Sequence, residues 1–517
     1  MRQLCRYLDR ARGLLAVLAA LTVFVGFITP ANAASANAAR SSFEKVDCWN
    51  SKGVETASIC GYLDVPEDWE EPGDRRIHLP VALFQAKNKK ENAVPVIFLT
   101  GGPGVSTNID KKNRREGWRR FADLDVPGHD LIVFDQRGAP LSQPALNCPN
   151  AHLPEHWAAV SNNPESFDDA LQREKTDLTA CYEQLLEEGH DLAAYTSRQS
   201  AQDLATLILL LGYDRAILVG VSYGTHLALT TMDLFPEQVE AAVLDSVLHA
   251  ADAQRDYFDQ SHAAFERLLD ACRDHDRCHQ AYPNLERDFV DLLDRLENEP
   301  VVLEIWNAQG HEPLYALLDR NVLLEVLFHA LYRNQPITKL PWTIDGLAKG
   351  EDRRIIPLLE DYLYNSFATY AAFGLSLSVW CREIYFHDPK PLPANSSDLA
   401  FHIYSWSEHF KTKGVCTYWP TGQLEPIEAK AVASEIPVLL LSGAFDPVTP
   451  IEYGDAVARH LPNSHHFVFP ATGHGQIGSD RCARQTMSDF VADPSKRPAP
   501  ACLDDLRQPA FLSLGGG

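Results

Sequence analysis

The stretch of sequence that decides the fold is AILVGVSYG at residues 216–224, a short apolar run that ends in Gly-x-Ser-x-Gly. The run is rich in β-branched residues and does not alternate with polar ones, as expected of a strand buried on both faces of a parallel sheet. A helical pattern follows at residues 225–235. A strand that passes into a helix through this motif needs a very tight turn, in which glycines avoid steric clashes. The pattern therefore predicts that Ser222 is a nucleophile exposed above a sheet.

Similar apolar runs flank this stretch, and helical patterns separate them, as at residues 197–212. The runs lie at residues 94–99, 131–134, 241–244, 436–442 and 465–469. Strands that alternate with helices predict a doubly wound, mostly parallel α/β sheet.

Between about residues 249 and 430 the pattern changes. Strand-like runs become rare, with residues 301–305 (VVLEI) as the exception, and amphipathic helical patterns replace them. These patterns lie at residues 261–272, 284–297, 320–333 and 354–370. We expect a large, mainly helical cap inserted after the sixth strand, between a first core part at residues 48–248 and a second at 431–517. Open α/β sheets bind ligands at the carboxyl ends of their strands, so such a cap would cover the site.

A serine nucleophile needs a base and a carboxylate that orients the base, and after this kind of turn they follow in the order acid, histidine. His474 lies in ATGHG just beyond the last strand-like run, where flanking glycines permit a loop that reaches Ser222. Asp446, in SGAFDP at the end of the preceding strand, is the predicted acid. Asp245, directly after the run at residues 241–244, is the alternative acid.

An oxyanion hole requires two N–H groups aimed at the negative charge of the tetrahedral intermediate. The first is expected from Tyr223, directly after the nucleophile. The sequence TGGPG at residues 100–104 follows a strand-like run, and its missing side chains would let substrate approach the backbone. We therefore predict Gly102 as the second donor.

Five short segments of the sequence together resemble the proline iminopeptidase and tripeptidyl aminopeptidase branch of the α/β-hydrolase serine peptidases. They are TGGPG, DQRG at residues 135–138, GVSYGT, GAFDPVTP and GHG, and the similarity runs from about residue 60 to about residue 502. The C-terminal part most resembles the secreted tripeptidyl aminopeptidase type. The resemblance implies an α/β-hydrolase fold, a Ser222–Asp446–His474 triad, and a cap that binds the free N-terminus of a peptide.

Two positions depart from the iminopeptidase pattern. Thr100 stands where a histidine usually precedes GGPG, and Ala139-Pro140-Leu141 replaces the usual small residue and glycine after DQRG. Both argue against specificity for a single proline more than against the hydrolase assignment.

An aminopeptidase also needs a counter-ion for the substrate ammonium group, best placed where the dielectric constant is low. Residues 376–383 (SLSVWCRE) resemble a recurrent cap segment of the branch, which makes Glu383 the candidate. The alternative is that Glu383 is a solvated acid on a helix.

The N-terminus has the features of an export signal. Residues 1–13 are basic, residues 14–28 are apolar, and PANA at residues 30–33 suits a cleavage site, so residues 1–33 are expected to be a signal peptide. A retained membrane anchor is the alternative. Residues 34–47 are expected to be a flexible leader. The protein should therefore be exported, to the periplasm or to the medium.

Cysteine usage agrees with export, because ten cysteines remain after Cys5 and an even set in an oxidising compartment indicates disulfides. Sequence does not fix their connectivity, and neighbour pairing is the simplest guess. It gives Cys48–Cys60, Cys148–Cys181, Cys272–Cys278, Cys381–Cys416 and Cys482–Cys502. The cluster Cys272, His275, Cys278 and His279 could hold a metal, but a small disulfide loop is the preferred interpretation.

The 517 residues are 45% hydrophobic and carry a formal charge of −24, which suits a globular protein and disfavours nucleic-acid binding. We expect a monomer that needs no cofactor or metal and does not stay on a membrane after signal cleavage. The predicted function is an exported serine aminopeptidase that releases short N-terminal peptides or single residues through an acyl-enzyme. A carboxylic-ester hydrolase with the same triad and a catalytically inactive binding module are the competing hypotheses.

Overall fold

The structure is a computed structural model that describes most of the chain after residue 34. The described residues are 35, 37–48, 57–148, 166–248, 257–306, 313–334, 336–365, 371–384, 392–412, 414–422 and 430–513. The predicted signal peptide at residues 1–33 lies outside them.

A nine-stranded sheet in the order β1-β2-β3-β5-β4-β6-β7-β10-β11 forms the core of the described chain. The strands are β1 (Ser42–Val46), β2 (Ile59–Pro66), β3 (Arg76–Phe84), β4 (Val96–Leu99), β5 (Leu131–Phe134), β6 (Ala216–Val221), β7 (Val239–Asp245), β10 (Val438–Gly443) and β11 (Ser464–Phe469). Neighbours from β5 to β11 are parallel, whereas β1, β2 and β3 add an antiparallel edge. The predicted, mostly parallel sheet is confirmed.

The strand before the cap, β7, is the seventh along the chain, not the sixth. Strand β1 also corrects the prediction of a flexible leader at residues 34–47. Residues Ser42–Val46 pair antiparallel with β2, and the Cys48–Cys60 disulfide joins the chain just after β1 to β2. Residues 42–46 are therefore part of the sheet.

Strand β6 is buried on both faces, which explains its unbroken apolar sequence. Leu218 packs in one cluster with Leu204 and Leu227 of helices α5 (Ser197–Leu210) and α6 (Tyr223–Leu234). The next residue, Val219, packs in the opposite cluster with Phe490. That second face is covered by α3 (Lys112–Leu124) and α18 (Arg481–Ala492). Apolar residues on both sides fix the register of the strand, and so the place where it ends at Val221, directly before Ser222.

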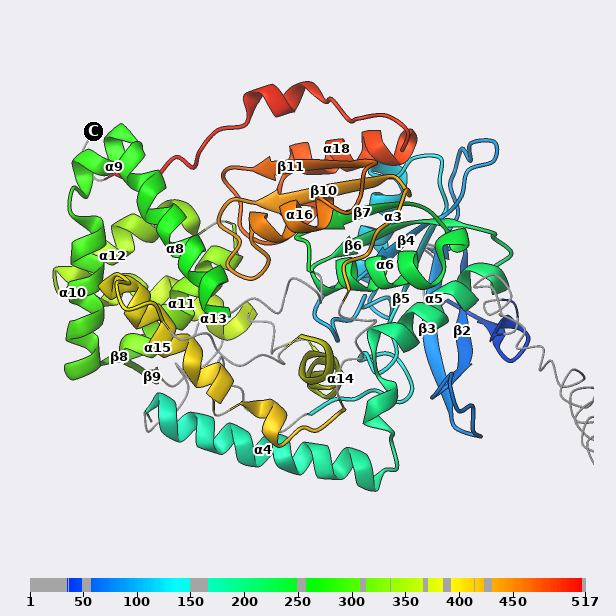
Figure 1. Cartoon of the computed structure of the whole chain (residues 1–517), viewed down its shortest axis with the longest axis horizontal. Coiled ribbons are helices and arrows are strands. Elements are labelled where there is room, and N and C mark those ends of the chain that lie inside the picture. The colour runs from blue at the N-terminus through cyan, green and yellow to red at the C-terminus, as the bar shows by residue number, and fades with distance from the viewer. Residues whose placement is uncertain are drawn as a thin grey trace, which may run out of the picture.

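The chain between β7 and β10 is mainly helical and lies beside the sheet (Figure 1). It contains α8 (Tyr257–Asp274), α9 (Asp276–Ala281), α10 (Leu285–Asn298), the antiparallel pair β8 (Val301–Trp306) and β9 (Pro313–Leu318), α11 (Arg320–Tyr332), α12 (Leu340–Ala348), α13 (Ile356–Asn365), α14 (Phe373–Val379) and α15 (Asp398–Thr412). Most of these elements share a second hydrophobic cluster, which includes the fully buried Phe289, Leu327 and Trp406. Helix α14 is the exception, because Phe373, Leu375 and Leu377 pack in the same cluster as the sheet residue Leu218. The segment between β7 and β10, called the cap below, therefore packs mostly as a second body, with α14 joined to the core.

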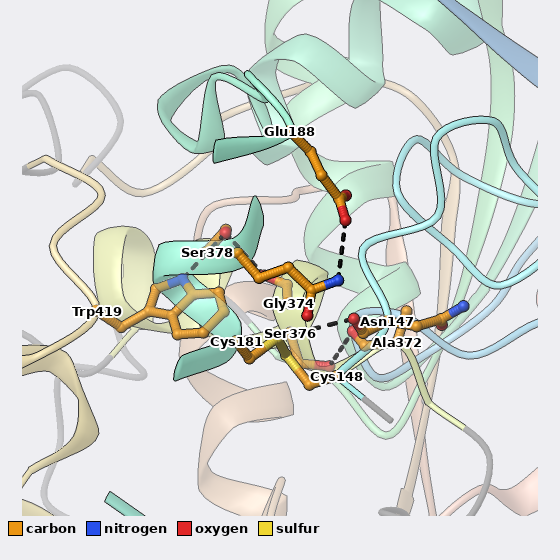
Figure 2. Close-up of a disulfide and its surroundings, with 10 residues drawn as sticks. Asn147, Cys148, Cys181, Glu188, Ala372, Gly374, Ser376, Ser378 and Trp419 are labelled. Atoms are coloured by element: carbon orange, nitrogen blue, oxygen red, sulfur yellow. Dashed lines mark hydrogen bonds between the residues drawn. A yellow bond between two sulfur atoms is a disulfide. The ribbon is translucent and has the colours of Figure 1, made fainter. Parts of the chain in front are cut away.

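All five disulfides pair neighbouring cysteines, as predicted. Figure 2 shows the Cys148–Cys181 bridge, which joins the chain after β5 to α4 (Phe167–Glu187), beside Gly374, Ser376 and Ser378 of α14. Cys272 and Cys278 bond to each other, so the metal interpretation of that cluster is wrong.

The C-terminal residues connect the core to the cap (Figure 1). The Cys482–Cys502 disulfide joins α18 to the turn Ala501–Asp505 on the core side. Beyond that turn, the N–H of Leu512 donates to Thr338 O at 2.8 Å, and Tyr282 Oη donates to Leu512 O at 2.8 Å. Both partners belong to the cap, so residues 506–512 form a strap from one body to the other.

Removing single disulfides should destabilise the protein according to the length of the closed loop. Cys148 and Cys181 are 33 residues apart, whereas Cys272 and Cys278 are 6 apart. The chain-entropy relation then predicts a loss of about 4 kcal/mol for the double serine variant of the first pair and about 2 kcal/mol for the second. Urea unfolding under non-oxidising conditions measures both, and equal losses would contradict loop entropy as the cause.

Candidate active site

Ser222 lies on a sharp turn between β6 and α6, with φ 56° and ψ −125°. A left-handed φ in a serine is strained, and it is the backbone geometry that this kind of turn imposes. A Cβ atom on Gly220 would lie 2.4 Å from Gly224 O, and one on Gly224 would lie 2.2 Å from Leu99 O. Both positions therefore require glycine, and the predicted turn around Ser222 is present.

The loop that contains Gly102 lies against this turn. A Cβ atom on Gly101 would lie 3.0 Å from Ser222 Cβ and 3.0 Å from Val221 O, so the missing side chain lets the two segments approach this closely without displacement. Tyr223 is the first residue of α6, where helix N–H groups have no intrahelical acceptor. The structure therefore brings Ser222, Tyr223 and the loop of Gly102 to one place.

Asp446 and His474 form a short, buried hydrogen bond, with 2.7 Å between Asp446 Oδ2 and His474 Nδ1. Asp446 is 0% exposed and His474 is 8% exposed. Thr449 Oγ1 donates to the same carboxylate oxygen at 2.7 Å, and the N–H groups of Val448 and Thr449 donate to Oδ1, both at 2.9 Å. Burial alone would raise the pKa of Asp446, but the His474 imidazole and the Thr449 donors hold that pKa below its ordinary value. The carboxyl group is thus kept ionised beside the imidazole.

The other ring nitrogen of His474, Nε2, is buried and has no hydrogen-bond partner among the described residues. It is thus not hydrogen-bonded to Ser222 Oγ in this structure. The ring of Tyr332 stacks on the imidazole with 4.5 Å between centroids, and the His474 N–H donates to Tyr332 O at 3.1 Å. Tyr332 ends α11, so the cap itself holds the histidine in orientation.

Asp245, the alternative acid, is bonded differently. Its two carboxylate oxygens accept the N–H groups of Gln476 and Ile477, each at 2.8 Å. These two residues begin α17 (Gln476–Ser479), directly after the histidine loop. Burial raises the pKa of Asp245 to about 6, against the lowering effect of the two backbone donors. His474 Nδ1 is bonded to Asp446 and not to Asp245.

Glu383 is 3% exposed and lies in the π-helical turn Trp380–Ile384 that follows α14. Its carboxylate accepts the Ser197 N–H at 2.7 Å and the Ser197 hydroxyl, and His226 Nε2 lies 3.0 Å from Oε2. Ser197 Oγ also lies 2.8 Å from Tyr223 Oη. Glu383 is therefore not a solvated helix residue, because it is almost fully buried and its carboxylate is hydrogen-bonded. Ser197 links this carboxylate to the hydroxyl group of Tyr223.

The cap also holds the loop of Gly102. Ser376 Oγ of α14 donates to Pro103 O at 2.6 Å, and the Ala372 N–H donates to Gly104 O at 2.9 Å. On the core side, Gln136 Nε2 of the DQRG segment donates to Thr100 O at 3.0 Å. The carbonyl groups on both sides of Gly102 are thus fixed.

Several residues of the site were not predicted from the sequence. Thr449 could have been found, because an Asp followed three residues later by Thr suits a turn in which the Asp side chain accepts local N–H groups. Tyr332, Ser376 and Ser197 reach the site from elements distant in sequence, and no local pattern marks them.

Within the part of the chain that the structure describes, no cluster of His, Cys, Asp and Glu side chains could hold a metal ion. None of the helices described there combines the length and the apolar character of a membrane span.

Residues 94–478 match the α/β hydrolase fold family, and the chain belongs to this family. It is 25% identical to tripeptidyl aminopeptidase of Streptomyces lividans over an alignment of 456 residues. This alignment covers 83% of this chain and 79% of the relative. The chain is 22% identical to serine protease Hip1 of Mycobacterium tuberculosis, with 87% and 88% covered. It is 25% identical to carboxylesterase B of Mycobacterium tuberculosis, with 85% of each covered. The predicted family is confirmed, and the chain is a serine hydrolase related to peptidases.

The variant Asp245→Asn should change the pH dependence of stability. Because the pKa of Asp245 is raised from 3.8 to about 6 on folding, the folded protein binds this proton more tightly than the unfolded chain does. The stability gained from this proton is fully present below the unfolded pKa and is lost as pH rises through the folded pKa. From about pH 4 to about pH 7, wild type should lose about 2 kcal/mol relative to Asp245→Asn, measured by urea unfolding.

Asp446→Asn is the control for this measurement. The pKa of Asp446 is lowered, so its contribution persists across that range and is lost only as pH falls below it. A difference between wild type and Asp245→Asn that stays constant with pH would contradict the titration of Asp245.

Proposed function

We propose that the protein is an exported serine aminopeptidase that releases short N-terminal peptides or single residues through an acyl-enzyme. The observation that carries the proposal is the buried Asp446–His474 hydrogen bond of 2.7 Å, with His474 Nε2 left without a partner in the described chain. An ionised carboxylate that fixes Nδ1–H leaves Nε2 as the basic nitrogen. A serine on a strained turn at the same sheet edge completes the set.

In the proposed reaction His474 Nε2 accepts the proton of Ser222 Oγ as this oxygen attacks the scissile carbonyl. Asp446 stabilises the imidazolium ion, and His474 then returns the proton to the leaving amine. Water activated by the same histidine hydrolyses the acyl-enzyme. Hydrogen bonds of this kind are often long without substrate, so an unpartnered Nε2 is compatible with the role of base.

The N–H groups of Tyr223 and Gly102 are proposed to hold the oxyanion. The support for this assignment is the closeness of Gly101 to Ser222 and the bracing of the adjacent carbonyl groups by Ser376 and Gln136. Donors fixed before the reaction need no reorganisation when the charge develops, which makes them effective.

Glu383 is proposed to bind the ammonium group of the substrate. The support is a carboxylate that is 3% exposed and is joined through Ser197 to Tyr223, so that a negative charge lies near the Ser222 turn in a poorly hydrated place. Ser197 and His226 already donate to both oxygens. An ammonium group would therefore add to this network or replace one of its donors.

A carboxylic-ester hydrolase is the second candidate, favoured by the similarity to carboxylesterase B. The same serine, acid and histidine attack esters and amides alike, so the triad does not separate the two. What separates them is the need for a free substrate amine.

We also propose that the protein acts in the periplasm or in the medium, as a monomer on peptides with a free N-terminus. Five disulfides support export, because such bonds persist in oxidising compartments. The net charge of −24 supports a role without nucleic acid, and a secretory signal at residues 1–33 would leave no anchor after cleavage.

Substituting the triad should abolish or strongly reduce turnover without unfolding the protein. Ser222→Ala removes the nucleophile, and Asp446→Asn leaves the imidazole in the wrong tautomer, with a loss of kcat on the order of 10⁴-fold. Steady-state kinetics and circular dichroism on each variant make the test. Retention of wild-type kcat in Asp446→Asn would refute the proposed acid.

Substrates that differ only at the N-terminus test the aminopeptidase assignment. A fluorogenic tripeptide amide with a free amine should be hydrolysed, whereas its N-acetylated form should be poor, because acetylation removes the charge that Glu383 is proposed to bind. Glu383→Gln should raise KM for the free-amine substrate and leave an aryl ester unaffected. The control variant is Asp345→Asn, another buried cap acid, which pairs with Lys349.

Equal hydrolysis of free and acetylated peptides would favour the ester hydrolase. If Glu383→Gln reduced peptide and ester hydrolysis equally, Glu383 would be a structural residue that supports the Ser222 turn and not the ammonium site.

A further inference from the structure

The last residue of β7 and the one after it, Asp245 and Ser246, are buried, with 0% exposure each. The proposed mechanism uses neither of them. Both, however, bond to segments that carry the proposed catalytic residues.

Side chains of this pair hold the histidine loop. Ser246 Oγ accepts the Gly475 N–H at 2.9 Å, and the Asp245 carboxylate accepts the N–H groups of Gln476 and Ile477. Three consecutive N–H groups directly after His474 are thus bonded to two consecutive residues of the sheet. Such a segment cannot shift without breaking charge-assisted hydrogen bonds in a buried place.

Main-chain groups of the same pair hold the other two segments. The Ser222 N–H donates to Asp245 O at 2.9 Å, which ties down the nucleophile turn. The Ser246 N–H donates to Leu441 O at 2.8 Å, in the strand that leads to Asp446. The two residues therefore contact the nucleophile, acid and histidine segments at once.

The backbone of Ser246 is also unusual, with a left-handed φ of 59°. Non-glycine residues in this region are strained, and such strain persists where surrounding contacts enforce it. Here the turn lets Asp245 point to residues 476 and 477 while the next hydroxyl points to residue 475. Glycine would adopt this φ without strain, but it would lack the Oγ atom with which Ser246 accepts the Gly475 N–H.

We propose that Asp245 and Ser246 are positioning residues that set the distance between Ser222 Oγ and His474 Nε2. This inference rests on the proposed function, because it matters only if these two atoms react together. A displacement of about 1 Å between reacting groups can cost on the order of 10²-fold in rate. Asp245 thus has a role distinct from that of the triad acid.

The test uses Asp245→Asn and Ser246→Gly. Glycine at 246 adopts the left-handed φ without strain but removes the acceptor of the Gly475 N–H, so folding is retained even if Asp245→Asn is unstable. Asp480→Asn is the matched control, because Asp480 accepts two consecutive N–H groups, of Cys482 and Ala483, at the far end of α17.

Three quantities are measured for each variant: kcat and KM on the tripeptide amide, and the rate constant of Ser222 labelling by a fluorophosphonate. We expect kcat and the labelling rate to fall about 10²-fold in both test variants, with KM within about twofold of wild type. Asp480→Asn should match wild type. A merely stabilising role would lower the thermal midpoint and leave kcat of the folded protein unchanged.

Two results would overturn the inference. One is wild-type kcat and labelling in folded Ser246→Gly and Asp245→Asn. The other is a larger loss in Asp245→Asn than in Asp446→Asn with Ser246→Gly unaffected, which would make Asp245 the triad acid. Failure of the proposed function is distinguishable, because wild type itself would then not hydrolyse the amide, whereas failure of the inference leaves wild-type hydrolysis intact. An ester hydrolase would still be labelled at Ser222, and the labelling rates would then test the inference without the amide.

Discussion

The buried hydrogen bond between Asp446 and His474 imposes the strictest requirement on the rest of the structure. Burying an ionised carboxylate costs free energy unless hydrogen-bond donors surround it. Asp446 has the imidazole, the Thr449 hydroxyl and two backbone N–H groups, and together they keep it ionised. These donors exist only if the chain turns tightly after β10 and if the loop after β11 returns to the same edge. The adjacent, parallel placement of β10 and β11 satisfies both conditions.

The cap contributes to this geometry directly and does more than cover it. Tyr332 stacks on the histidine, Ser376 fixes the loop of Gly102, and Glu383 reaches the helix that begins at Tyr223 through Ser197. Each contact comes from a different cap element. The geometry around Ser222 and His474 therefore depends on the chain between β7 and β10 as well as on the sheet. Tyr332 contributes from α11 in the second hydrophobic cluster, whereas Ser376 and Glu383 lie in a segment that packs in the cluster of the sheet.

Sequence was sufficient where the physical cause is local. The strand at residues 216–221 is apolar throughout because both of its faces are buried, and the glycine at 220 is required by a contact within one turn. Gly224 is part of the same motif, although the contact that requires it is with Leu99 of the neighbouring strand β4. The disulfides pair near neighbours, so the simplest connectivity was correct. Asp446 and His474 were predicted from chain order at the ends of two strands, and the structure places them within a hydrogen bond of each other.

Sequence was insufficient where partners lie far apart along the chain. The antiparallel strands β2 and β3 were not expected, and β1 was taken for part of a leader because its five residues carry little apolar signal. Asp245 was considered only as an acid. Its partners, the N–H groups of Gln476 and Ile477, are more than 200 residues away, and a backbone donor leaves no trace in the residue type.

The strap at residues 506–512 has a mechanical consequence. The chain enters the helical body after β7 and leaves it before β10, and two attachments of this kind would let that body swing about the line between them. The strap adds a third attachment at Thr338 and Tyr282, anchored on the core by a disulfide. Rotation of the helical body away from the sheet would therefore have to break the two hydrogen bonds at Leu512 or displace the C-terminal residues together with it.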